Sequence, residues 1–149
     1  MLRVGIWEGE TGLAHRLEGC LPGGTVIGQH PALFSQDVFD LLLITPGAAG
    51  WAGAGKILCR TALLPGTAFS LTRILRADSA VSYGVSAKDT LTISSLEGRQ
   101  ACVALQRDVL VLDGSTLERQ EFVLPFPAGE DPLFFLALTG ARLLLTGKP

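Results

Sequence analysis

The sequence predicts an α/β fold: a three-layer, mainly parallel sheet of the Rossmann or flavodoxin type, extended by antiparallel hairpins and followed by an apolar C-terminal helix. Three observations predict this class. The first half of the chain alternates short apolar runs with helix and turn signals, which is typical of crossover units. The second half places short strands close together between turn residues, which is typical of hairpins. The last long segment is a helix that is apolar on nearly every side.

The length of 149 residues fits one domain with a core of its own. We therefore predict a single domain over residues 1–149, with a crossover part at 1–86 and a part made of hairpins and a helix at 87–149. Charged residues make up 17% of the chain, against about 25% in a typical domain. Because little polar material is left to cover a monomer, we expect a homo-oligomer.

Charge and hydropathy exclude several classes of partner. The net charge of -2 and the lack of a Lys or Arg cluster argue against nucleic acid. No apolar stretch approaches the roughly 20 residues of a membrane helix or forms a secretion signal, so we expect a cytoplasmic protein without a membrane partner. The three cysteines, at 20, 59 and 102, form no CxxC pair. We therefore expect free thiols, no metal site and no cofactor.

The first three strands and the first helix follow from short local patterns. Residues 2–7 are predicted as the opening strand, and residues 11–20 as a short helix with Thr11 as a possible N-cap. Residues 25–28 are predicted as the second strand. The third, DLLLIT at 40–45, is an unbroken apolar run, which is typical of a parallel strand buried on both faces.

The segment KILCRTALLPG, which starts at Lys56, fits a helix and a strand equally well by periodicity. A strand over 56–64 is favoured, because Pro65-Gly66 stops the segment and no N-cap other than glycine precedes it. A short amphipathic helix is expected at 68–77 and a further strand at 80–85.

Hairpins and a final helix are expected in the second half. Residues 90–94, 101–105, 109–112 and 121–124 read as short strands, with Asp113-Gly114 as a turn. Asp131 is then a plausible N-cap and Pro132 a first helical residue, followed by a helix to about Leu145. A helix apolar all round must be buried, either inside the chain or against another subunit.

The glycine-rich segment before Lys56 is a near-match to a phosphate-binding loop. Gly50, Gly55 and Lys56 have the required spacing, and DLLLIT supplies the preceding strand. However, Ile57 stands where a hydroxyl should hold magnesium, and an extended chain after Lys56 would leave no helix N-terminus for the phosphates. We interpret the segment as a Gly/Ala connection with a free lysine.

Nothing in the sequence nominates a catalytic residue. With histidines only at 15 and 30, a Ser or Cys triad has few ways to form. The acids of the second half alternate along predicted hairpins, which is typical of a solvated sheet face. The glycines at 5, 9 and 12 lack the spacing of a dinucleotide-binding fingerprint.

Ligands of open parallel sheets bind beyond the carboxyl ends of the strands. The loops to examine are therefore 8–12, 45–47, 65–67 and 84–88, and Lys56 is added as the remaining phosphate-loop residue. The candidate ligand-binding residues are Glu8, Glu10, Thr11, Thr45, Gly47, Lys56, Gly66, Thr67 and Ser86.

Four stretches resemble a family of small bacterial proteins without an assigned function: LLPG at 63–66, VSYGVSAKDTLTISSL at 81–96, LQRDVLVLDG at 105–114 and QEFVLPF at 120–126. This resemblance implies a shared fold and no particular activity. The Tyr83-Gly84 pair, followed by hairpins and a helix, is also similar to the end of the central domain of the Mur-type peptide ligases. The chain lacks their intact phosphate loop and is too short for their three domains, so ATP-dependent ligation is not carried over.

Two functions of different class are expected from these observations. The favoured one is a non-catalytic binding or assembly domain of the cytoplasm. The alternative is a small-molecule or nucleotide-handling enzyme that uses the loops at the carboxyl ends of the parallel strands.

Overall fold

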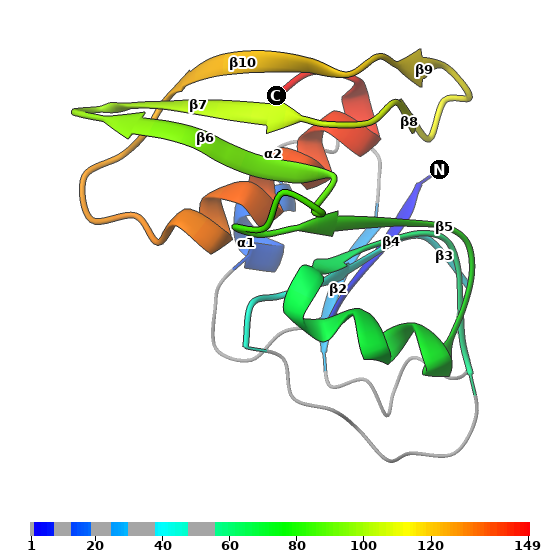
Figure 1. Ribbon diagram of the computed structural model, residues 1–149. Helices are drawn as coiled ribbons and strands as arrows, with labels where there is room; N and C mark the ends of the chain where they lie inside the picture. Colours follow the sequence, from blue (N-terminus) through cyan, green and yellow to red (C-terminus); the bar gives the residue numbers. More distant parts are fainter. Residues whose placement is uncertain (1, 8–12, 19–24, 30–37, 48–55) are drawn as a thin grey trace.

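The computed structural model describes residues 2–7, 13–18, 25–29, 38–47 and 56–149 (Figure 1). Eight strands form one sheet in the order β10-β7-β6-β5-β4-β3-β1-β2, and β8 and β9 form a separate pair. The elements are β1 (Arg3–Trp7), α1 (Leu13–Glu18), β2 (Thr25–Gln29), β3 (Val38–Ile44), β4 (Ile57–Pro65), the 3-10 helix η2 (Gly66–Ile74), β5 (Leu75–Tyr83), β6 (Leu91–Glu97), β7 (Gln100–Leu105), β8 (Val109–Leu110), β9 (Thr116–Leu117), β10 (Gln120–Pro125) and α2 (Pro132–Thr146).

Five neighbouring strands, β2-β1-β3-β4-β5, run parallel, so the sheet is mostly parallel as predicted. The strands expected at 2–7, 25–28 and 40–45 correspond to β1, β2 and β3. The ambiguous segment after Lys56 is the strand β4, which confirms the extended alternative. No helix N-terminus therefore follows Lys56, as a phosphate-binding loop would require.

The hairpins of the second half are also confirmed. β6, β7 and β10 pair antiparallel, and β6 joins the parallel part through one paired position, Tyr83 with Leu91. The predicted turn at Asp113-Gly114 joins β8 to β9, with Gly114 at a φ of 94°. The Asp113 carboxylate accepts hydrogen bonds from the backbone N–H and the hydroxyl of Ser115, and these bonds lower its pKa.

The helix expected at 68–77 is wrong in type and in extent. The segment is a 3-10 helix that begins at Gly66 and ends at Ile74, and Leu75 already belongs to β5. Leu75 pairs with Ile57, and Arg76 pairs with Leu58 of β4. The pairing of β5 with β4 therefore takes precedence over the helical periodicity of the local sequence.

Apolar side chains of the parallel strands pack on both faces of the sheet, as the run DLLLIT predicted. Leu41 and Leu43 belong to a cluster that includes buried residues of α1 and α2. Leu42 and Ile44 belong to a second cluster, against which Leu71 of η2 packs. Because neighbouring strand residues point to opposite faces, these two clusters lie on opposite sides of the sheet.

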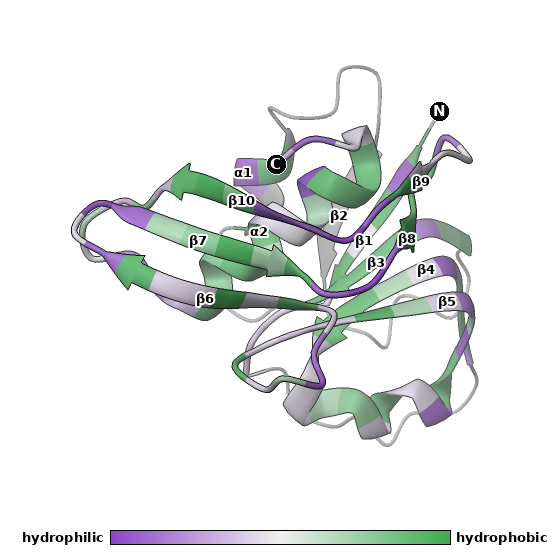
Figure 2. Ribbon diagram, turned by 45° about the horizontal axis from the view of Figure 1, so that its top comes forward, coloured by the Kyte–Doolittle hydropathy of each residue, from purple (hydrophilic) through white to green (hydrophobic). Residues whose placement is uncertain are grey.

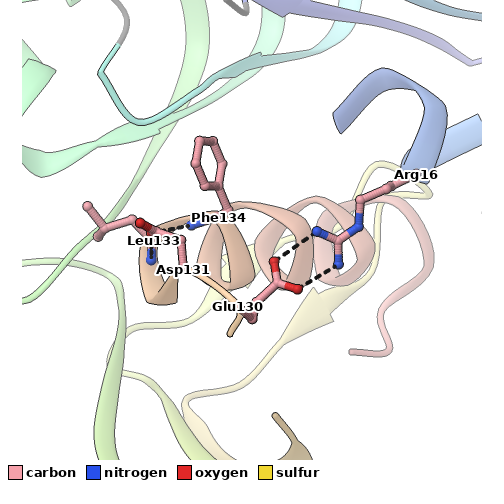
Figure 3. A network of polar contacts seen from close by, with 5 residues as sticks. All are labelled: Arg16, Glu130, Asp131, Leu133 and Phe134. Carbon is pink, nitrogen blue, oxygen red and sulfur yellow. Dashed lines mark hydrogen bonds and ion pairs between the residues drawn. The ribbon is translucent and has the colours of Figure 1, made fainter. Parts of the chain in front are cut away.

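The start of α2 is the predicted one. The Asp131 carboxylate accepts hydrogen bonds from the backbone N–H groups of Leu133, at 2.8 Å, and Phe134, at 3.3 Å (Figure 3). Two hydrogen bonds of 2.9 and 3.4 Å join the Arg16 guanidinium of α1 to Glu130, just before this cap. These contacts connect α1 to the start of α2.

The apolar surface of α2 is buried within the chain. Its residues 135–141 and 143–145 are buried, and the helix contacts β3, β4, β5 and β6. Gly140 allows a close approach, because a Cβ there would lie 3.0 Å from a methyl group of Leu63. The helix needs no second subunit to cover it, so the expected homo-oligomer stays a prediction that rests on the low charge alone.

Figure 2 shows that β6, β7 and β10 carry both hydrophobic and hydrophilic segments. Within the part of the chain that the structure describes, none of the helices combines the length and hydrophobicity needed to cross a membrane.

Candidate functional site

Two adjoining cavities lie beyond the carboxyl ends of β4 and β5. The first, of about 300 Å³, is lined by residues that follow these two strands and by one residue of α2. The second, of about 350 Å³, shares Gly66, Lys88 and Asp89 with it. The first is lined by Pro65, Gly66, Thr67, Tyr83, Gly84, Val85, Ser86, Lys88, Asp89 and Leu133, and the second adds Phe69, Ala80, Ser82, Thr90 and Arg107.

Asp89 lies at the junction of the two cavities and is only 5% exposed. Its Oδ2 accepts a hydrogen bond of 3.1 Å from the backbone N–H of Ser86. Among the described residues, no group donates to its Oδ1. Every fully enclosed side-chain nitrogen or oxygen of that part of the chain has a partner, so Oδ1 is open to the cavity.

Two glycines make room for this carboxylate. A Cβ at Gly66, directly after β4, would overlap Oδ1 of Asp89, and a Cβ at Gly84, directly after β5, would overlap Oδ2. Neither glycine has a positive φ. The requirement for glycine is therefore one of space, because the carboxylate sits between the backbones of two strand ends.

The loop that carries Asp89 is held in place by the antiparallel part of the sheet. Gln106, directly after β7, donates from its side-chain amide to the backbone carbonyl of Asp89 at 2.7 Å. The Arg107 guanidinium donates to the Thr90 hydroxyl at 3.1 Å. Within the loop, the Asp89 N–H donates to the Ser86 carbonyl at 3.0 Å. The position of the carboxylate is thus fixed by residues from both parts of the sheet.

Tyr83 forms an inner wall of the first cavity and is fully buried. Its hydroxyl donates a hydrogen bond of 2.6 Å to the backbone carbonyl of Ile44. Burial raises the pKa of Tyr83 well above its usual range. The phenol is therefore neutral and already bonded, so it acts as a fixed apolar wall and not as an acid or base.

Three of the sequence-predicted residues line the first cavity: Gly66, Thr67 and Ser86. The predicted loops 65–67 and 84–88 therefore lie side by side, because β4 and β5 are parallel neighbours whose carboxyl ends meet at one edge. That these residues bind a ligand stays a prediction.

The other described candidates lie elsewhere. Thr45 is buried and closes the end of β3, because both its hydroxyl and its N–H donate to the Trp7 carbonyl. Gly47 is exposed, with a φ of 79°. Lys56 precedes β4, whereas Gly66 follows it, and the nine residues between them span about 30 Å. Lys56 is therefore not part of the cavity.

The candidates Glu8, Glu10 and Thr11 lie outside the described residues.

Three charged residues line the cavities, and none of them is a named candidate: Lys88, Asp89 and Arg107. Lys88 lies within the predicted loop 84–88, whereas Asp89 and Arg107 lie outside every predicted loop. The loop prediction ended at Lys88, one residue before the carboxylate. An aspartate in a short loop is usually a turn residue, and its sequence context does not reveal burial. Arg107 lies in a connection between two strands, and only the pairing of β6 with β7 brings it to the cavity.

Comparisons of the chain with family models, with curated proteins and with solved structures found no match. The resemblances to a bacterial family and to the Mur-type ligases stay predictions. Among the described residues, no three His, Cys, Asp or Glu side chains form a group that could hold a metal ion.

Proposed function

We propose that the chain is a non-catalytic binding domain whose small ligand occupies the two adjoining cavities. We also propose that the sheet is of the three-layer flavodoxin type, since the order β2-β1-β3-β4-β5 is that of flavodoxin-like sheets. Ligands of such sheets bind at the carboxyl edge, where the cavities lie. The order reverses at β1, so the cavities are displaced along that edge toward β5.

The observation that carries this proposal is the carboxylate of Asp89, of which one oxygen has a hydrogen-bond donor and the other has none among the described residues. A buried charge is costly unless it is paired and hydrogen-bonded. Oδ2 has a backbone donor, but Oδ1 is without one among the described residues and opens into the cavity. A ligand that places a donor there completes the pairing of a carboxylate that is only 5% exposed.

The lining residues favour binding over chemistry. A nucleophilic mechanism requires an activated Ser, Cys or Lys beside a base, and proton transfer requires a pair of groups aimed at one substrate atom. Neither cavity is lined by a histidine or a cysteine among the described residues. Ser86 and Lys88 line the first cavity with Asp89, but neither side chain donates to its carboxylate, and the Tyr83 hydroxyl is already bonded to a carbonyl. The enzyme alternative therefore gains no specific support from this site.

The proposal is tested by mapping where small molecules bind. Amide chemical shifts are followed by NMR during additions of amines, amino acids, carboxylates, sugars and nucleosides. We expect the shifts that change to cluster at residues 65–69, 82–90 and 106–107. A panel in which no class changes these shifts would contradict the proposal.

A matched pair of variants makes the mapping specific. Val85 is 89% exposed at the rim of the first cavity, and Val38 is 61% exposed at the start of β3. Val85→Trp should block the cavity and abolish the shift changes, whereas Val38→Trp should leave them intact. Both positions are open to solvent, so neither substitution should prevent folding. Equal binding by both variants would place the ligand elsewhere.

A further inference from the structure

We propose that the ligand is an amino-acid-like zwitterion with an apolar side chain, whose ammonium group meets Asp89 and whose carboxylate meets Lys88 and Arg107. This inference rests on the proposed binding function. It goes further by assigning a chemical role to each wall of the two cavities.

The open oxygen of Asp89 selects an ammonium group. A guanidinium binds a carboxylate through two parallel hydrogen bonds, which need both oxygens. At Asp89 the backbone N–H of Ser86 already donates to Oδ2, so Oδ1 is the oxygen without a donor among the described residues. One free oxygen suits an ammonium, which is a compact point charge with independent donors. The ion pairs found among the described residues join Arg16 to Glu130 and Arg60 to Asp40, so they leave Asp89 for a ligand.

Two cations line the second cavity together with Asp89. They are Lys88 and Arg107, and neither forms a salt bridge with a described residue. The hydrogen bond from Arg107 to Thr90 orients the guanidinium and leaves its remaining N–H groups available. A ligand that carried only an ammonium would be repelled by these cations. A carboxylate on the same ligand turns that repulsion into attraction.

The first cavity supplies the apolar wall. Pro65, Tyr83, Val85 and Leu133 line it beside the carboxylate. Its volume of about 300 Å³ is at the lower end of the range for ligand sites and leaves room for an apolar side chain. An apolar side chain placed here would cover the edge of the core, and the two charged groups of the ligand would remain near the junction of the cavities.

The test uses leucine and two analogues that each lack one charge. L-Leucine, 4-methylpentanoate, which lacks the ammonium, and isopentylamine, which lacks the carboxylate, are titrated into the full chain by calorimetry. Phenylalanine and methionine serve as larger apolar amino acids. We expect an amino acid to bind, and both leucine analogues to bind at least tenfold more weakly than leucine.

Two substitutions separate the charged contacts. Asp89→Asn should weaken leucine at least tenfold but should not weaken 4-methylpentanoate, because that analogue has no ammonium and loses only the repulsion between its carboxylate and Asp89. Lys88→Ala should weaken leucine and 4-methylpentanoate to a similar degree. Lys148→Ala, at the exposed end of the chain, is the matched control and should change neither. If Asp89→Asn fails to fold, as judged by circular dichroism, the exposed Lys88 still provides the test.

The outcomes distinguish this inference from the proposed function. Leucine binding that Asp89→Asn leaves unchanged would overturn the ammonium assignment. If no amino acid binds but another class of molecule changes the shifts at 82–90, the zwitterion is wrong and the binding function stands. If no class changes them, both are wrong.

Discussion

The parallel and antiparallel parts of one sheet differ in how many faces they bury. Every residue from 41 to 44 of β3 and from 61 to 65 of β4 is buried. In β7 buried residues alternate with half-buried ones, and β10 has no buried residue. Crossover connections carry the chain over the faces of a sheet, whereas hairpins keep it in the plane. The difference shows that connectivity, more than strand composition, decides which faces are covered.

The candidate site lies where these two parts meet. β5 and β6 pair at a single position, Tyr83 with Leu91, and residues 84–90 between them belong to no strand. Gly66, which follows β4, lies close beside the Asp89 carboxylate, and the side-chain amide of Gln106, which follows β7, donates to the backbone carbonyl of Asp89. The short pairing of β5 with β6 thus leaves a cavity that is lined by residues from both parts of the sheet.

The largest expected effect tests the difference in burial directly. Leu63 of β4 is fully buried against α2, and Val123 of β10 is 67% exposed. Leu63→Ala should lower the free energy of unfolding by about 2–5 kcal/mol, because it removes buried methyl groups and leaves a cavity. Val123→Ala should change it by less than about 0.5 kcal/mol. Urea unfolding measures both, and similar losses would contradict the two-part description.

A smaller loss of stability is expected from substitutions at the start of α2, the helix that packs on one face of the sheet against β3, β4, β5 and β6. Asp131→Ala removes the side-chain acceptor for two backbone N–H groups and should cost about 1 kcal/mol. Asp131→Asn keeps an acceptor and should cost a few tenths of that amount. Thermal unfolding measures the stability of the two variants. An equal loss in both would show that the side-chain acceptor at residue 131 does not stabilise the helix.

The smallest expected difference is in the rate at which two free cysteines, one in each part of the sheet, are chemically modified. Cys59 of β4 is buried, and burial, with a smaller contribution from Asp78, raises its pKa to about 12. Cys102 of β7 is half-buried. At pH 8, iodoacetamide should therefore modify Cys102 faster than Cys59, because the thiolate is the reactive form. Mass spectrometry of the peptides measures the two rates, and faster modification of Cys59 would contradict its burial.

The same pKa shift gives a pH dependence with a definite sign. The folded-state pKa of Cys59 lies above the ordinary value of 9.0, so its contribution to stability is complete below pH 9 and is lost as the pH rises toward 12. Cys59→Ala should flatten the fall in stability between pH 9 and pH 12 relative to the unmodified chain. An unchanged slope would mean that Cys59 is not desolvated.

Several elements could be predicted from local sequence because their cause is local. The strand β3 follows from an unbroken apolar run, the β8–β9 turn from Asp113-Gly114, and the start of α2 from Asp131 and Pro132. The helix expected at 68–77 failed because the pairing of Leu75 with Ile57, eighteen positions earlier in the chain, decides the conformation there. Pairing between strands that are distant in the sequence cannot be recognised from a short stretch of residues.

By itself the sequence determined an α/β chain with parallel strands first, hairpins second and an apolar helix last, because hydrophobic periodicity and capping act over a few residues. Only the tertiary structure decided that α2 is buried within its own chain and that Asp89, flanked by Gly66 and Gly84, lines one cavity with Lys88 and Arg107. Burial and charge pairing depend on which distant segments become neighbours, and that is a property of the folded sheet.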